Sequence, residues 1–149
     1  MLQRGEFEIS FGSQYGYLDL VQEIADRVSR MVGLDEEACY RVGLSIRESV
    51  TNAIQHGNKL DDRKKVGIRF EITPDRLIVC VQDQGQGFDE SMVPNPLDAE
   101  NLLKPGGRGV FYVRSFMDNV CYRTLPEGGM EIRMEKILNC KNEGEDNED

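Results

Sequence analysis

Two short turns constrain the fold of this chain more than any other feature of its sequence. The first, 73–76, reads Thr-Pro-Asp-Arg, and the second, 126–129, reads Pro-Glu-Gly-Gly. Proline fixes φ where a tight turn needs it, and aspartate and glycine are common turn residues. The strand-like segments that flank these turns are 66–73, 77–81, 120–125 and 130–138. Strands joined by tight turns pair antiparallel, so the pattern predicts two hairpins of a largely antiparallel sheet.

Two amphipathic helices are predicted in the first part of the chain. Across 15–32, apolar residues recur every three or four positions, which gives a helix with one buried face. Ser13 or a near neighbour is expected to cap this helix, and Gly33 to end it. Asp35 is expected to cap a second helix, 35–56, because an aspartate at this position accepts a hydrogen bond from the first turn.

The order of the predicted elements defines the fold class. A strand at 6–11 precedes the two helices, and a third helix is predicted at 110–117, between the two hairpins. The fold class is therefore α+β: a two-layer α/β sandwich with a mostly antiparallel sheet, covered on one face by three helices.

A polar stripe marks the end of the second predicted helix. Glu48 and Asn52 are four residues apart, so they share one face of the helix and lie about 6 Å apart along its axis. Gln55 and His56 continue this face. A solvated polar stripe is the alternative interpretation. A histidine near a helix C-terminus is also electrostatically favourable, which favours a supporting role for His56 over a catalytic one.

Two glycine-rich segments follow. Asp83, Gly85 and Gly87 form an Asp-x-Gly-x-Gly motif after a buried strand, where glycines allow a sharp turn and the close approach of a planar ligand. The aspartate could accept a hydrogen bond from an exocyclic amine such as that of adenine. A plain turn is the alternative, because aspartate and glycine are common in turns.

The second glycine segment, Gly107-Arg108-Gly109, begins a predicted helix after a long loop at 90–105. Its backbone N–H groups, together with the partial positive charge of a helix N-terminus, suit a phosphate. A helix start without a ligand is the alternative. Long loops in compact domains are usually functional or mobile.

Together these motifs resemble the Bergerat-type (GHKL) ATPase superfamily. Glu-x-x-x-Asn-x-x-x-His on a helix, Asp-x-Gly-x-Gly after a strand and Gly-x-Gly before a helix occur in this order. Segments 48–57 and 109–118 are most similar to the anti-sigma-factor serine/threonine kinases of bacterial partner-switching systems. The resemblance covers about residues 5–138 and implies the Bergerat ATP-binding fold.

The resemblance also implies roles for the residues of the first two motifs. Asn52 would ligate Mg²⁺, which bridges the phosphates of ATP and prefers hard oxygen ligands. Glu48 would be the general base that takes the proton from an attacking hydroxyl. Asp83 would bind the adenine amine, and Gly85 and Gly87 would allow the base to approach closely.

For the phosphates, the resemblance implies backbone contacts from Gly107 and Gly109. The loop 90–105 would form a lid over ATP. Related kinases often carry an arginine just before the glycine pair, and in its place Lys104 or Arg108 could reach the γ-phosphate.

The resemblance implies an ATP- and Mg²⁺-dependent serine/threonine protein kinase that acts as an anti-sigma factor. It would phosphorylate a small anti-sigma-factor antagonist, sequester a sigma factor and form a homodimer. Two alternatives are a partner-switch module that binds nucleotide and captures regulators without kinase activity, and a detached histidine-kinase catalytic domain. Glu48 favours the kinase, since a pure binder needs no base one turn from the metal ligand.

Composition narrows the partners and the location. The net charge of −9 argues against direct nucleic-acid binding, which needs a basic surface. The sequence has no apolar run of about 18 residues and no signal-peptide pattern at its start, so we expect a cytoplasmic protein without membrane contact. The four cysteines lack zinc-ligand spacing. We expect one kinase domain, 1–138, and an acidic disordered tail, 139–149.

Overall fold

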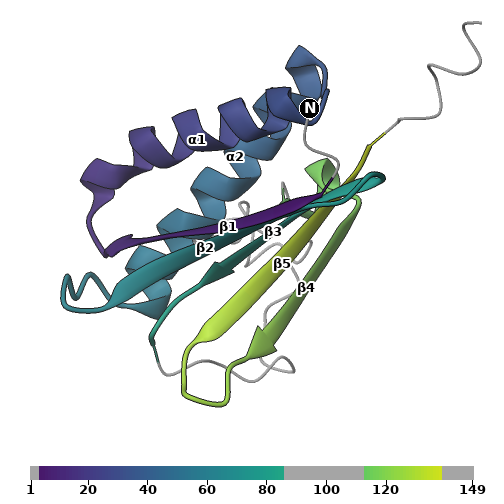
Figure 1. Ribbon diagram of the computed structural model, residues 1–149. Helices are drawn as coiled ribbons and strands as arrows, with labels where there is room; N and C mark the ends of the chain where they lie inside the picture. Colours follow the sequence, from purple (N-terminus) through teal and green to yellow (C-terminus); the bar gives the residue numbers. More distant parts are fainter. Residues whose placement is uncertain (1–3, 86–112, 139–149) are drawn as a thin grey trace, which may run out of the picture.

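The computed structural model describes residues 4–85 and 113–138, which build a five-stranded antiparallel sheet (Figure 1). Its strand order is β1-β2-β3-β5-β4, and every neighbouring pair is antiparallel. The strands are β1 (Gly5–Gly12), β2 (Lys65–Ile72), β3 (Arg76–Gln82), β4 (Asn119–Thr124) and β5 (Met130–Ile137). The antiparallel sheet predicted from the two turns is confirmed.

Both predicted hairpins form at the expected positions. Ile72 pairs with Leu77 next to the first turn, and Thr124 pairs with Met130 next to the second. In the second turn, Gly128 and Gly129 have φ values of 94° and 90°. Such values favour glycine, because a side chain is strained in this region.

Two long helices, α1 (Leu18–Met31) and α2 (Glu36–Asn52), cover one face of the sheet (Figure 1). A short 3₁₀ turn, Tyr15–Tyr17, leads into α1, and a π-helical turn, Ala53–Gly57, follows α2. Of the predicted third helix, residues 113–116 are helical and 110–112 lie outside the described residues. The two-layer sandwich is thus confirmed. No helix in the described part of the chain is long and apolar enough to cross a bilayer.

The core lies between the helices and the sheet because both periodicities bury one side of their element. In α2, residues four apart line the buried face, and in β2 and β3 alternate residues do. Each large aliphatic side chain buried here contributes about 1.5–3 kcal/mol relative to exposure. The largest fully buried side chains include Val21, Ile46, Val50, Ile54, Phe70, Leu77 and Met134.

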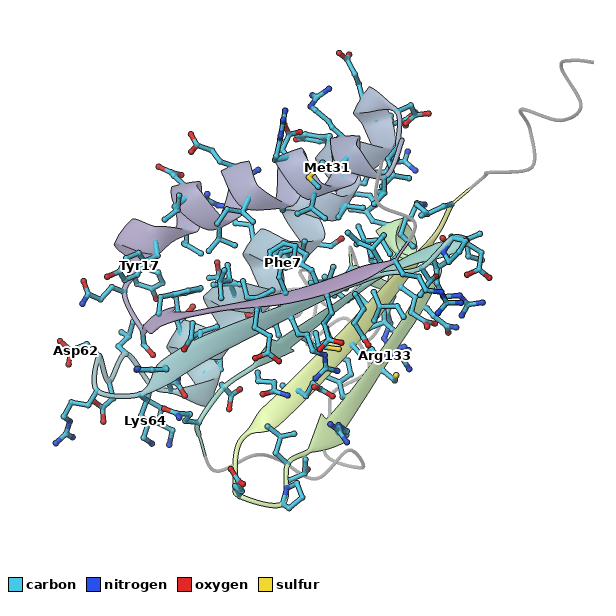
Figure 2. The ribbon with its side chains drawn as sticks, in the orientation of Figure 1. Phe7, Tyr17, Met31, Asp62, Lys64 and Arg133 are labelled. Atoms are coloured by element: carbon cyan, nitrogen blue, oxygen red, sulfur yellow. The ribbon has the colours of Figure 1, made fainter. Side chains whose placement is uncertain are left out.

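The opposite face of the sheet carries ion pairs. Arg123 Nε lies 2.6 Å from Glu131 Oε2, and Arg76 and Arg133 contact Glu135 at 3.3 and 3.1 Å. Arg133 is labelled on this face in Figure 2. The alternation of β5 places these carboxylates on the side opposite its core-facing residues Ile132 and Met134.

One predicted cap is confirmed and the other is wrong. Asp35 Oδ1 accepts a hydrogen bond from the Ala38 N–H at 2.8 Å, as expected of an N-cap. Ser13 caps no helix: its hydroxyl donates to the Lys64 carbonyl at 2.7 Å, and Gln14 and Tyr17, at the two helix starts, make no side-chain cap. The hydroxyl of Ser13 therefore joins β1 to the start of β2.

Candidate functional site

Glu48 and Asn52 occupy the last turns of α2, where the sequence predicted them, and both are half-buried. Burial raises the pKa of the Glu48 carboxyl above its ordinary value, and the electrostatic interaction with His56 partly opposes this. His56 itself is exposed. Near the end of α2, the Glu48 carboxyl, with its raised pKa, thus lies one turn before the side-chain amide of Asn52.

A π-helical turn replaces the regular end that was predicted for this helix. The Asn58 N–H donates to the Ala53 carbonyl at 2.8 Å, five residues back, and the Leu60 N–H donates to Ile54. Lys59 and Leu60 then have positive φ, at 52° and 62°. Single π turns recur at functional sites, and non-glycine residues with positive φ store strain. The apolar spacing gave no sign of this turn.

Asp83 lies where β3 ends and is only 4% exposed. Its Oδ1 accepts hydrogen bonds from the backbone N–H groups of Gly85 and Met130, at 3.0 and 3.1 Å. Burial raises the pKa of the Asp83 carboxyl, while these two hydrogen bonds and the charge of Lys64 work in the opposite direction. The structure thus positions a buried carboxylate by main-chain donors from two different elements.

Three glycines from three elements allow the chain to close around Asp83. A Cβ on Gly57 would overlap Oδ2 of Asp83, and one on Gly129 would overlap its carbonyl oxygen. A Cβ on Gly85 would overlap the Gly57 carbonyl. Glycine is thus required at the end of α2, after β3 and in the β4–β5 turn. The sequence indicated a close approach only for Gly85, and there of a planar ligand and not of the Gly57 main chain. It gave the other two glycines as a helix stop and a turn.

Tyr122 interacts electrostatically with Glu48, and the sequence did not single it out. The Arg114 guanidinium carbon lies 5.7 Å from the centre of the Tyr122 ring, within cation–π range. Burial raises the pKa of Tyr122 to about 12, with Arg114 lowering it and the charge of Glu48 raising it. The alternating pattern of β4 predicts that Tyr122 faces the helices, but not which residue it meets.

The remaining predicted site residues lie outside the described residues, so their roles stay predictions. They are Gly87, Lys104, Gly107, Arg108, Gly109 and the loop 90–105. Within residues 4–85 and 113–138, no cluster of three or more His, Cys, Asp or Glu side chains could hold a metal ion. Magnesium in phosphate sites usually takes only one or two protein oxygens, so a single amide such as that of Asn52 still fits it.

The model of the histidine kinase-like ATPase domain family matches residues 11–136, and the chain belongs to that family.

Within the family, the chain is similar to proteins named serine-protein kinase RsbW. It is 30% identical over 138 residues to the one from Bacillus subtilis, an alignment that covers 89% of this chain and 85% of the relative. It is also 30% identical over 139 residues to the one from Staphylococcus epidermidis, covering 87% of this chain and 86% of the relative.

Solved structures share the fold. The RsbU and RsbW domains of a Mycobacterium tuberculosis protein superpose with a TM-score of 0.64 at 14% identity, covering 89% of this chain and 32% of theirs. The catalytic domain of histidine kinase ThkA gives 0.58 at 15% identity, covering 89% and 98%. At such identities the likeness concerns the fold alone.

Proposed function

We propose that this protein is an ATP- and Mg²⁺-dependent serine/threonine kinase and anti-sigma factor. It phosphorylates a small anti-sigma-factor antagonist and sequesters a sigma factor. The observation that carries the proposal is the half-buried Glu48, one turn before Asn52 on a helix whose end packs against the buried Asp83. Relatives named serine-protein kinase, aligned over most of the chain, support the same reaction class.

Asp83 is proposed to recognise adenine. Two backbone N–H groups bond its Oδ1, and Oδ2 faces Gly57. A carboxylate oxygen fixed in this way can accept a hydrogen bond from the exocyclic amine of adenine. Gly85 would let the base lie close to the main chain, because glycine has no side chain.

Asn52 and Glu48 are proposed to serve the phosphates and the acceptor hydroxyl. The amide oxygen of Asn52 is a hard ligand of the kind that magnesium prefers, and bound magnesium would neutralise phosphate charge. Glu48 accepts the proton of the attacking serine or threonine hydroxyl. Its raised pKa suits this task, because a base works best when its pKa approaches the working pH.

The partners follow from the same proposal. A small antagonist protein offers the acceptor hydroxyl, and a sigma factor binds when the antagonist is absent. The protein acts as a homodimer in the cytoplasm, and direct contact with nucleic acid is disfavoured by the net charge of −9.

The test uses this protein, [γ-³²P]ATP, Mg²⁺ and a small anti-sigma-factor antagonist protein. We expect label on a serine or threonine of the antagonist. Millimolar Mg·ATP should also raise the thermal midpoint of the kinase, because a ligand that binds only the folded state stabilises it. A thermal shift without label transfer would favour the binding module, and the absence of both would overturn the nucleotide assignment.

A further inference from the structure

Asn58 is a fully buried polar residue just beyond the π-helical turn, and the proposed mechanism gives it no role. Its exposed fraction is 0%. Its Nδ2 donates to Ser13 Oγ at 2.8 Å and to the Lys65 carbonyl at 3.0 Å. Its Oδ1 accepts from the Gln84 N–H at 2.7 Å. Each of these partners lies further from Asn58 in the sequence than the partner of an ordinary capping bond does.

The orientation of the Asn58 amide is fixed by its partners. A backbone N–H can only donate and a carbonyl can only accept, so the oxygen must face Gln84 and the nitrogen must face Lys65. Such a residue cannot be replaced by an apolar one without leaving buried groups unpaired, which is costly.

The contacts of Asn58 tie three elements together at the site. The main chain of Asn58 closes the turn that follows α2, and its side chain reaches the start of β2 and the residue directly after Asp83. Gln84 adds a second link, because its Oε1 accepts a hydrogen bond from the Lys65 N–H at 2.6 Å. Lys64, beside these residues, is labelled in Figure 2 at the loop that leads into β2.

We propose that Asn58 is a positioning residue for Asp83, and the proposal rests on the adenine-binding role given to Asp83 above. By holding the Gln84 N–H, Asn58 fixes the turn 83–85 against the end of α2. It thereby sets where the Asp83 carboxylate meets the ligand relative to Glu48 and Asn52. The residue touches no substrate itself, so its loss should alter recognition of the base amine in particular.

The experiment compares the affinities for two ligands in the presence of Mg²⁺: ATP, and purine riboside triphosphate, which lacks the exocyclic amine. We expect the wild-type protein to prefer ATP at least tenfold. In Asn58→Ala this preference should fall below threefold. A purely structural role would lower the thermal midpoint and leave the preference unchanged.

Ser13→Ala is the matched control, because it removes one hydrogen bond of the Asn58 nitrogen and leaves the oxygen on Gln84. Its preference for ATP should stay within twofold of wild type. Should Asn58→Ala not fold, Asn58→Ser replaces it, since a serine hydroxyl is too short to reach Gln84. Amide exchange at Gln84 gives a ligand-free measure, and it should accelerate in either Asn58 variant and not in Ser13→Ala.

The outcomes separate the positioning role from the proposed function. An unchanged preference in the Asn58 variant, or an equal loss in Ser13→Ala, would overturn the positioning role while leaving ATP recognition intact. A wild-type protein that binds neither ligand, or does not prefer ATP, would overturn the adenine-binding role of Asp83 and the positioning role with it.

Discussion

Asp83 and Glu48 are acidic residues at the same end of the molecule, and burial raises the pKa of both, yet their surroundings differ. Asp83 is held by two backbone N–H groups and enclosed by glycines. Glu48 is half-buried on a helix flank, and its pKa responds to the electrostatic interaction with one exposed histidine. A fixed carboxylate suits recognition of a ligand. A less confined one with raised proton affinity suits proton transfer.

The largest expected effect comes from removing the basic group of Glu48. In Glu48→Gln the rate of phosphoryl transfer should fall by about 10²–10⁴, the usual contribution of a general base, while nucleotide affinity changes little. Initial rates of label transfer and calorimetric binding measure the two quantities. Glu37→Gln is a suitable control, because Glu37 lies exposed near the start of the same helix. A loss of less than tenfold would contradict the assigned base.

Gly85→Ala tests the confinement of Asp83. The added methyl group would overlap the Gly57 carbonyl, so the free energy of unfolding should fall by about 3 kcal/mol, as for a severe overpacking change. Urea unfolding measures it. Gly67→Ala is the matched control: a Cβ there meets nothing within 4 Å, and the variant should be as stable as wild type or slightly more stable. Equal losses in the two variants would show that the enclosure is loose.

Asp83→Asn tests recognition apart from folding. The affinity for ATP should fall about 10–100-fold, which corresponds to the loss of a hydrogen bond to a charged group.

The same variant should keep its stability. An asparagine oxygen can still accept hydrogen bonds from the N–H groups of Gly85 and Met130, so the thermal midpoint should be retained or raised at pH 7. The sign of the pH dependence of stability follows from the raised pKa of Asp83. The stabilisation contributed by the Asp83 carboxyl is present in acid and is lost as pH rises through its folded-state pKa. Unfolding of both proteins between pH 4 and 7 measures this, and a variant less stable at every pH would contradict it.

The smallest effect is the pH dependence of catalysis. Because the pKa of Glu48 is raised, its carboxyl holds its proton to higher pH than an ordinary glutamate, and the transfer rate should rise as this proton is lost. We expect up to about a tenfold rise between pH 5 and 7. Glu48→Gln should flatten the profile. A wild-type rate that does not change over this range would argue that Glu48 is already ionised.

Much of the fold could be predicted because local chemistry and the final structure agree. The turn sequences predict the two hairpins, and Asp35 caps α2 as its position after a helix-stopping glycine suggested. The strand order could not be predicted in this way. In the structure β5 lies between β3 and β4, and only long-range pairing decides that order. Ser13 was misassigned for a similar reason: its partners are more than 40 residues away.

At the site, spacing predicted the shared face of Glu48 and Asn52, and the structure confirms both on the last turns of α2. Spacing could not predict that Gly57 and Gly129 close around Asp83, because nothing local distinguishes a glycine that ends a helix from one that admits a neighbouring chain. Tyr122 and Asn58 were missed because their partners, Arg114 and Gln84, belong to other elements of the fold, and spacing within one element does not reveal them. The roles expected of the predicted lid remain predictions.

Because of the π-helical turn at Ala53–Gly57, the number of residues in this segment matters to the site as well as their identity. A π turn holds one residue more than the regular helical path between the same two ends. If the same residues continued as a regular helix without the π turn, everything after the segment would be rotated by about 100°. Gly57 would then no longer face Asp83, and Asn58 would lose Gln84. Relatives that keep this site should therefore keep the extra residue of the turn, and should vary chiefly at the exposed positions Gln55 and His56.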